Sequence, residues 1–231
     1  MIRVAVAGAL GKMGHVARAA LASAQGALEY AGGYARVAVP YERITDDLGE
    51  LLSRADVLLD LSTRPGSVDI SLQAAAQGVR PVIGATGWTD DERAALAATL
   101  AERGIGGMLV PNFSIGAVLL MRLAEEAAKY LPSTEIVEMH HAGKKDAPSG
   151  TSLLTAERIA RVAGKMPAIH SVRLPGLVAH QEVLFGGSGE LLTLRHDSFS
   201  RESFVPGMFA AIKAVMHARG LVVGLDAVLR E

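Results

Sequence analysis

The sequence has no cysteine, few aromatic residues and almost no net charge. Without cysteine, disulfides, iron–sulfur clusters and thiolate zinc sites are excluded. The formal net charge of −1 argues against a general nucleic-acid-binding protein, because such a protein needs a basic surface. Hydrophobic residues make up 50% of the chain and charged residues 20%, which is typical of a globular protein. Its 231 residues suffice for one large domain or two smaller ones with their own cores.

Long hydrophobic runs are also missing. The longest candidates are interrupted by Arg122 or Glu125, so we expect no membrane span. At the N-terminus, Arg3 lies in a short apolar run that leads directly into a glycine loop, whereas a secretory signal needs a longer apolar core and a small-residue cleavage site. We therefore expect a cytoplasmic protein that binds neither membranes nor nucleic acids.

A glycine-rich motif follows the first apolar run. Residues 2–7 have the pattern of a strand that is buried on both faces. They run into Gly8-Ala9-Leu10-Gly11-Lys12-Met13-Gly14, which is followed by an alanine-rich helix through about residue 24. Glycines at this point allow a tight turn, close approach of backbone to a pyrophosphate and close helix–strand packing. The context of strand and helix favours dinucleotide binding over a simple turn.

The choice between NADH and NADPH depends on the end of the second predicted strand, residues 28–34. An acidic residue there favours NADH, but the sequence continues Gly32-Gly33-Tyr34-Ala35-Arg36 without a carboxylate. Arg36, together with Lys12, is suited to pair with the 2′-phosphate of NADPH. Arg36 is equally well explained as an ordinary surface residue. The pattern favours NADPH without excluding NADH.

Strands and helices alternate through the first half of the chain. We expect strands at 57–61, 81–83 and 108–110, with helices at 46–54, 67–77 and 89–103. This alternation predicts a Rossmann-type, doubly wound parallel sheet, whose ligands lie beyond the carboxyl ends of the strands. The residues expected beside the glycine loop are therefore Thr63, Arg64, Gly84, Ala85, Thr86, Asn112 and Phe113.

The second half of the chain has a different pattern. Residues 114–130 form an amphipathic helix that we expect to connect two domains. Strands are expected at 134–139, 171–174, 180–185 and 190–196, and a helix at 153–162. This predicts a smaller α+β domain whose open mixed sheet carries one helix, with its other face buried against another subunit. A helix at 206–218 and the segment 221–229 should pack back on the first domain. The predicted domains are 1–113, completed by 206–231, and 114–205.

The loop between the strand at 134–139 and the next helix concentrates reactive groups. It contains His140, His141, Lys144 and Lys145 and ends in Pro148-Ser149-Gly150-Thr151. Histidine exchanges protons near neutral pH, and lysine supplies a positive charge and a proton. The backbone N–H groups of a helix start suit a carboxylate or phosphate. Each residue alone is better explained by simple exposure, but their concentration beside a helix start predicts a site that binds an anion and protonates something beside it.

Taken together, these motifs resemble the dihydrodipicolinate reductase family, whose members act in lysine and diaminopimelate biosynthesis. The resemblance covers essentially the whole chain and is most specific in its second half. It rests on residues 4–14, Ser62-Thr63-Arg64-Pro65, Gly84-Ala85-Thr86-Gly87, Pro111-Asn112-Phe113-Ser114, Glu138-Met139-His140-His141, Lys144, Asp146-Ala147-Pro148-Ser149-Gly150-Thr151, Arg173, His180 and Ser200-Arg201. The chain departs from the family pattern around Tyr34, where an acidic residue is usual, and near Leu174, Pro175 and Ala179.

The resemblance implies specific roles. His140 would be the proton donor and Lys144 a second donor, while His141, Gly150 and Thr151 would bind a carboxylate of a cyclic dicarboxylate substrate. Lys145 would be a bystander, and Arg201 would either touch substrate or brace its loop. The dinucleotide, NADPH or NADH, would be held by Gly8, Ala9, Leu10, Gly11, Lys12, Met13, Gly84, Ala85, Thr86, Val110, Pro111, Asn112 and Phe113. Family members are typically homotetramers assembled through the sheet of the second domain.

Two other functions remain open at this stage. Another Rossmann imine or amino-acid dehydrogenase would have the same glycine loop, but the His-His-Lys sequence favours dipicolinate chemistry. A non-catalytic dinucleotide sensor would predict a helix-turn-helix, a basic face or an added interaction domain, and the sequence shows none of these.

Overall fold

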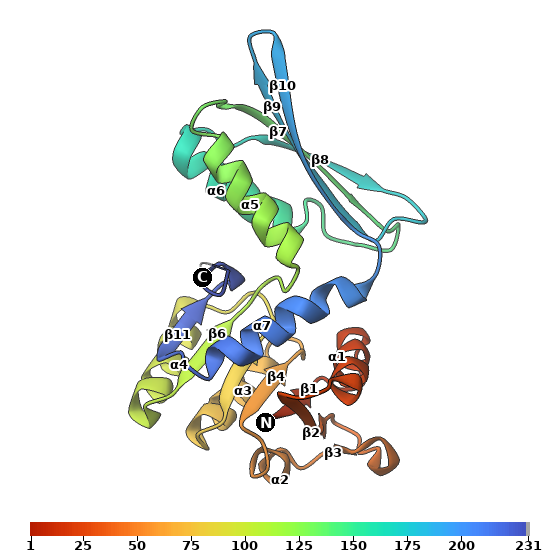
Figure 1. The fold of residues 1–231 in the computed structure, drawn as a ribbon, viewed down its shortest axis with the longest axis vertical. Coiled ribbons are helices and arrows are strands. Elements are labelled where there is room, and N and C mark those ends of the chain that lie inside the picture. Colours follow the sequence, from red (N-terminus) through yellow and green to blue (C-terminus); the bar gives the residue numbers. More distant parts are fainter. Residues whose placement is uncertain (230–231) are drawn as a thin grey trace. The chain divides into compact units, whose positions relative to one another are not determined.

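The structure, a computed structural model, describes residues 1–229, and it divides into two compact units. The first unit comprises Met1–Phe113 together with residues 204–229, and the second is Ser114–Ser203. Each unit contains one β-sheet (Figure 1). The predicted segment 206–231 ends in two residues, 230 and 231, that lie outside the described residues.

The sheet of the first unit has seven strands, and all its strand pairs are parallel. In spatial order the strands are β11 (Gly220–Val223), β6 (Gly106–Leu109), β5 (Arg80–Ile83), β4 (Val57–Asp60), β1 (Ile2–Ala7), β2 (Leu28–Tyr34) and β3 (Ile44–Thr45). The strand order reverses between β1 and β4, the point where open α/β sheets bind ligands. The predicted Rossmann-type sheet is thus confirmed, with β3 and β11 as additional edge strands.

Helices alternate with these strands as the pattern indicated, and the last of them leads from the second unit into β11. They are α1 (Lys12–Ser23), α2 (Leu48–Leu52), α3 (Gly66–Ala76), α4 (Asp90–Arg103) and α7 (Val205–Val215), with short 3₁₀ turns at Pro40–Glu42, Arg201–Phe204 and Leu225–Ala227. The predicted capping box of α4 is present, since Thr89 and Glu92 each bond the other's backbone N–H. The last predicted helix ends three residues earlier than expected, at Val215.

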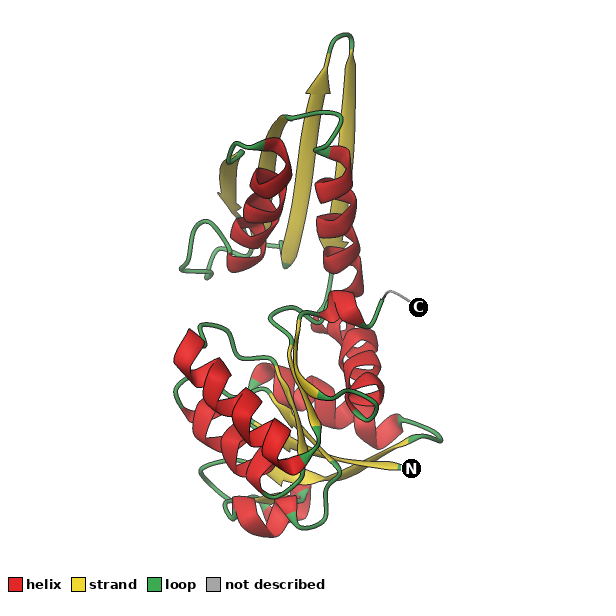
Figure 2. Cartoon of the chain, turned by 90° about the vertical axis from the view of Figure 1, so that its left-hand side faces the viewer, coloured by secondary structure: helices red, strands yellow, loops and turns green. Residues whose placement is uncertain are grey.

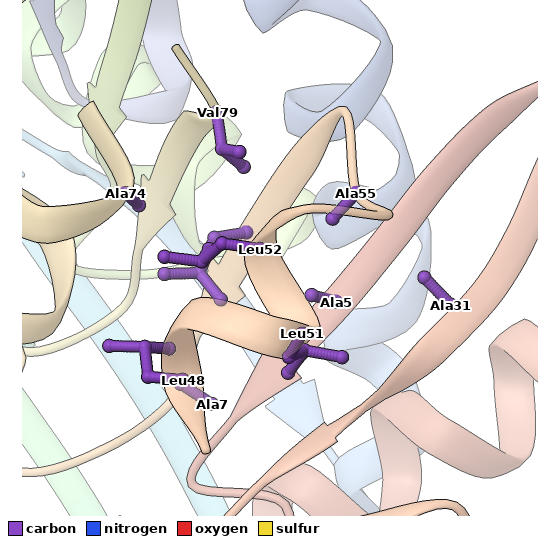
Figure 3. Packing of buried hydrophobic residues seen from close by; sticks show 10 residues of the cluster. Ala5, Ala7, Ala31, Leu48, Leu51, Leu52, Ala55, Ala74 and Val79 are labelled. Atoms are coloured by element: carbon purple, nitrogen blue, oxygen red, sulfur yellow. The ribbon is translucent and has the colours of Figure 1, made fainter. Parts of the chain in front are cut away.

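A core of small and branched residues lies under α2. Leu48, Leu51 and Leu52 of that helix pack on residues of β1, β2 and α3, as Figure 3 shows. The partners at this contact are mostly alanines, among them Ala5 and Ala74. Because alanine has only a methyl group, the short helix can lie close to the sheet without leaving a void.

The sheet of the second unit has four strands and mixed pairing. Its order is β10 (Glu190–Ser198), β9 (Ala179–Gly187), β7 (Ser133–His140) and β8 (Ala168–Arg173). β7 pairs with β8 in parallel and with β9 antiparallel, while β9 and β10 form an antiparallel hairpin. This confirms the predicted open mixed sheet.

Two helices, not the single one expected, cover this sheet. Both α5 (Ile115–Ala127) and α6 (Gly150–Ala163) pack on one face of it, as Figure 2 shows. Residues of α5 and α6, such as Leu120 and Ile159, share a buried cluster with Ile136 and Phe185 of the sheet. The segment 114–130 was expected only to connect domains, but its apolar stripe is long enough to fill half of this core. No helix in residues 1–229 has the length and apolarity that a membrane span requires.

Candidate active site

The glycine loop in the first unit depends on the absence of side chains. Gly8 has a positive φ of 70°, and a Cβ on it would lie 2.7 Å from the carbonyl carbon of Leu61. A Cβ on Gly14 would lie only 2.2 Å from the carbonyl oxygen of Gly8. The loop therefore packs directly against the end of β4, and α1 packs directly against the loop. Larger residues at either position would force the backbone apart.

The start of α1 fits a negatively charged group. Gly11 is its N-cap and provides no capping side chain, and the first turn contains no acidic residue. The first N–H groups of a helix lack intrahelical partners and lie at the positive end of its dipole. These features suit a pyrophosphate, so the residues present fit the dinucleotide that the glycine spacing predicts.

The loops that follow four neighbouring strands begin side by side. Leu61 N donates to Ala7 O at 3.1 Å, Gly84 N to Asp60 O at 2.8 Å, and Val110 N to Ile83 O at 2.7 Å. These hydrogen bonds extend the parallel pairing of β1, β4, β5 and β6 by one residue beyond the ends of the strands. The segments beginning at Gly8, Gly84 and Val110, all predicted to bind the cofactor, therefore lie at one edge of the sheet.

The predicted cofactor residues differ in exposure. The buried residues fix the shape of the loops by packing in the core, and the exposed residues present their backbone or side-chain atoms to solvent. Ala9, Ala85, Val110 and Phe113 are buried; Gly8, Met13, Gly84 and Asn112 are partly exposed; Leu10, Gly11, Lys12, Thr86 and Pro111 are exposed. Glycine is needed at position 84, because a Cβ there would lie 2.9 Å from the Phe113 ring.

Arg36 lies two residues beyond the end of β2 and is exposed. The strand end itself touches the glycine loop, since Ala9 N donates to Tyr34 O at 3.2 Å. Arg36 thus follows the strand next to β1, where a residue that distinguishes NADPH from NADH is expected.

A buried carboxylate that the sequence analysis gave no role supports the loop after β4. Asp60 is fully buried and accepts hydrogen bonds from the backbone N–H and hydroxyl of Ser62, from Ser67 Oγ and from Ser71 Oγ. Its signal in the sequence was a single acidic residue at the end of an apolar strand, followed by serines. Arg64 in the same loop pairs with Glu92 at 2.8 Å, and this hydrogen bond lowers the pKa of Glu92 to about 2.

In the second unit, His140 lies on the sheet and not in the loop where the sequence analysis placed it. It is the last residue of β7, in register with Arg173 of β8 and Ala179 of β9. Strands on both sides hold its backbone. The position of the imidazole is therefore set by a rigid element and not by the loop.

His140 belongs to a network of charged side chains that the sequence did not reveal. Its Nδ1 lies 2.5 Å from Oε2 of Glu138, two residues earlier on the same face of the strand. Arg173 donates to both Glu138 oxygens, at 2.9 and 2.7 Å, in the bidentate geometry that suits guanidinium and carboxylate. The Glu138 side chain is 0% exposed and that of His140 is 14% exposed.

The surroundings shift both ionisable groups downward. Burial and the positive charges of Lys144 and Arg173 lower the pKa of His140 below 6.5, against the opposing effect of Glu138. Burial alone would raise the pKa of Glu138, but hydrogen bonds from Arg173, Ser171 and His140 outweigh it and lower that pKa. Glu138 is therefore ionised near neutral pH, and His140 readily gives up a proton.

The loop after β7 holds the second predicted proton donor. Lys144 Nζ lies 2.8 and 2.7 Å from the two carboxylate oxygens of Asp146, and Lys144 N donates to His141 O at 3.0 Å. Arg173 donates to the carbonyl oxygen of Asp146 at 2.7 Å and so ties the loop to the network of Glu138. The side chain of Lys144 is 22% exposed.

The predicted carboxylate-binding residues lie at the two ends of this loop. Ser149 caps α6 by accepting from Ser152 N at 3.2 Å, so the helix begins at Gly150 and Thr151. Gly150 and the side of the loop that carries His141 are exposed. The helix start is again free of acidic residues in its first turn, as an anion site requires.

Comparison with known families matches both units. The description "Dihydrodipicolinate reductase, N-terminus" matches residues 2–113, and "Dihydrodipicolinate reductase, C-terminus" matches residues 116–229. The chain belongs to the dihydrodipicolinate reductase family.

Individual members of the dihydrodipicolinate reductase family align over three quarters or more of the chain. The 4-hydroxy-tetrahydrodipicolinate reductase of Streptococcus suis (strain 05ZYH33) is 44% identical, over 99% of both chains. That of Halalkalibacterium halodurans is 48% identical over 75% of this chain and 74% of its own. The structure resembles dipicolinate-bound dihydrodipicolinate reductase from Paenisporosarcina sp. TG-14 with a TM-score of 0.89 and 38% identity, covering 98% and 99% of the two chains.

Proposed function

We propose that this protein reduces 4-hydroxy-tetrahydrodipicolinate to tetrahydrodipicolinate with a nicotinamide dinucleotide, a step in diaminopimelate and lysine biosynthesis. The observation that carries the proposal is the match to the dihydrodipicolinate reductase family over both units. The network of His140, Lys144 and Glu138 supports it, because such a reduction needs a proton as well as a hydride. As a biosynthetic enzyme the protein would act in the cytoplasm.

The first unit would hold the dinucleotide, chiefly through backbone. The N–H groups of Lys12 and Met13, in the first turn of α1, would face the pyrophosphate, while Gly11 N donates to Gly8 O at 2.9 Å and so holds the loop in shape. Segments 84–86 and 110–113, which begin beside the glycine loop, would position the rest of the molecule. When bound, the reduced nicotinamide supplies the hydride.

The second unit would orient the substrate and supply the proton. Gly150 and Thr151 at the start of α6, with His141, would bind one carboxylate of the cyclic substrate. Overall, the substrate gains a hydride and a proton and loses its 4-hydroxyl as water. His140 would donate the proton from Nε2, because Nδ1 is engaged with Glu138, and Lys144 would be the second donor. A positioned acid typically contributes ~10²–10⁴-fold to the rate.

NADPH is the cofactor we favour. The end of β2 carries no acidic side chain that would repel a 2′-phosphate. Arg36 follows this strand end and Lys12 follows the glycine loop, and both are exposed. Charge-assisted hydrogen bonds from such groups would stabilise the phosphate. NADH remains a substrate in this proposal, with weaker binding.

We further propose a homotetramer formed through the sheet of the second unit. α5 and α6 cover one face of that sheet, whereas Val137, Met139 and Leu184 on the other face are partly exposed and Leu191 is 66% exposed. A partly apolar sheet face of this kind is suited to pairing with a copy of itself. Light scattering should give four times the chain mass of 24.1 kDa.

The activity is tested by a single spectrophotometric assay. Purified protein is mixed with the aldol product of pyruvate and aspartate semialdehyde, and NADPH and NADH are supplied in separate reactions. We expect loss of absorbance at about 340 nm (the reduced nicotinamide band) with both cofactors. At low cofactor concentration the absorbance should fall faster with NADPH than with NADH. No absorbance loss with either cofactor would refute the proposed reaction.

A further inference from the structure

Glu138 belongs to the sequence motif around His140, but no role was assigned to it from the sequence. Its side chain is 0% exposed, and its carboxylate is held from both sides, by Arg173 in bidentate geometry and by His140 Nδ1. A carboxylate is costly to bury, and burial is tolerated only where charged partners and hydrogen bonds compensate. A neutral side chain at this position would avoid that cost, so the carboxylate requires an explanation.

The same strand offers a second carboxylate–histidine pair for comparison. Glu135 accepts from His170 Nε2 at 2.8 Å, but Glu135 is 61% exposed and lies on the opposite face of the sheet. Exposed pairs of this kind contribute little, because solvent screens them. The two pairs therefore differ in burial and in the presence of an arginine, while the partner types are the same.

We propose that Glu138 is a positioning residue that fixes the tautomer and stabilises the protonated form of His140, with Arg173 holding its carboxylate in place. This inference rests on the proposed function for its catalytic consequence. An ionised carboxylate at Nδ1 accepts a hydrogen bond from the N–H of that nitrogen, which leaves Nε2 as the atom that gains and loses the transferred proton. In a neutral histidine without this partner, either nitrogen can carry the proton.

The charges around His140 show why such a partner is needed. Lys144 from the loop and Arg173 from β8 are both positive and both disfavour the imidazolium, and burial acts in the same direction. Asp146 is paired with Lys144, and Glu138 is the acidic group that bonds the imidazole directly. Glu138 therefore opposes every other influence and keeps the acid form of His140 accessible.

Arg173 connects this pair to the loop. Arg173 Nη1 and Nη2 each donate to one carboxylate oxygen of Glu138. Nη2 also donates to the carbonyl oxygen of Asp146. One side chain thus fixes the carboxylate behind His140 and the loop that carries Lys144. Both proton donors are positioned by the same guanidinium.

The test compares Glu138→Gln with Glu135→Gln as a matched control on the same strand. In the ligand-free protein, the pKa and tautomer of His140 are measured by ¹⁵N NMR of the imidazole nitrogens, with His140→Gln used for assignment. For wild type we expect a neutral form protonated at Nδ1. For Glu138→Gln we expect a lower pKa of His140. Its kcat should fall by about tenfold or more, and by no more than the ~10²–10⁴-fold that a positioned acid contributes in total. The pH at which kcat declines should shift in the same direction as the NMR pKa, and Glu135→Gln should match wild type.

Each outcome decides the inference. If the pKa and tautomer of His140 are the same in Glu138→Gln as in wild type, Glu138 does not position His140, whatever happens to kcat. If Glu138→Gln does not fold, Glu138→Asp is used in its place. This variant keeps the negative charge but moves the carboxylate away from His140 by the length of one methylene. An unchanged pKa and tautomer of His140 in Glu138→Asp would equally overturn the proposal. Because the NMR measurement needs no substrate, it stands even if wild type fails to turn over, and that failure would count against the proposed function alone.

Discussion

The two units present their candidate binding residues in different ways. In the first unit the loops at the edge of the sheet act through backbone, since Gly8, Gly14 and Gly84 leave no room for side chains. In the second unit the candidate functional groups are charged side chains joined in one network, with Glu138 at its buried centre. This contrast teaches that a dinucleotide site can be built from chain geometry, while a proton-donating site needs side chains whose charges are balanced against each other.

The largest expected effect concerns the side-chain site. His140→Gln removes the proposed acid and should lower kcat by ~10²–10⁴-fold, because a positioned acid contributes that much. Turnover is followed by absorbance of the reduced cofactor. His170→Gln, a change to an exposed histidine that pairs with Glu135, is the control and should retain wild-type kcat. An unchanged kcat in His140→Gln would show that the proton comes from elsewhere.

The next effect tests the part of the first unit that uses a side chain. Arg36→Ala should raise KM for NADPH by about ten- to a hundredfold, since a hydrogen bond to a charged group contributes about 1.5–3 kcal/mol. KM for NADH should stay the same, because NADH lacks the 2′-phosphate. Steady-state kinetics with each cofactor measure the ratio. Equal changes for both cofactors would mean that Arg36 does not recognise the phosphate.

A third change tests the backbone-based site. Gly14→Ala places a Cβ 2.2 Å from Gly8 O, and the shift that this forces should cost about 1–3 kcal/mol in stability. We expect a lower Tm and weaker dinucleotide binding. Gly66→Ala is the matched control, because a Cβ there would lie more than 4 Å from every atom outside its chain neighbours and the nearby backbone of its own helix. If Gly14→Ala and Gly66→Ala have the same Tm, the close packing of α1 on the loop has no energetic importance.

The smallest effect is the pH dependence of stability. Burial is the main cause that lowers the pKa of His140 in the folded protein. As the pH falls through 6.5, His140 therefore takes up a proton more readily in the unfolded chain than in the folded one, and the free energy of unfolding should decrease. Burial raises the pKa of Glu138, but its hydrogen bonds outweigh this and the net shift is downward, so a further loss should follow as pH falls below 4.5. Urea unfolding at several pH values measures both. In His140→Gln the loss just below pH 6.5 should be smaller, and an equal loss would contradict the assignment.

The sequence predicted the first unit well because its signals are local. Apolar runs and glycine spacing depend on neighbouring residues, and the predicted strands were found within a few residues of their expected ends. The edge strand β11 was not predicted, because Gly220–Val223 forms a strand by pairing with β6, which lies more than a hundred residues earlier in the chain. Such pairing leaves no mark in a short window of sequence.

For the second unit, the sequence predicted the residue types but not their connections. His140 and Lys144 stand out in a local motif, whereas the link from Glu138 to Arg173 joins residues 35 positions apart. Nothing in the spacing of one strand indicates which charged residue its neighbour will present. Likewise, the sequence does not show that α5 is part of the core, because its apolar residues are buried only by packing against α6 and the sheet.

We assign cofactor binding to the first unit and proton donation to the second, and the dissociation constant of NADPH for the His140→Gln variant tests this assignment most directly. It is measured by fluorescence titration beside the kcat of the same preparation, with Gly14→Ala as the converse case. We expect a wild-type dissociation constant for His140→Gln despite its lost turnover, and a raised dissociation constant for Gly14→Ala. A His140→Gln protein whose NADPH affinity falls as far as its turnover would contradict the assignment.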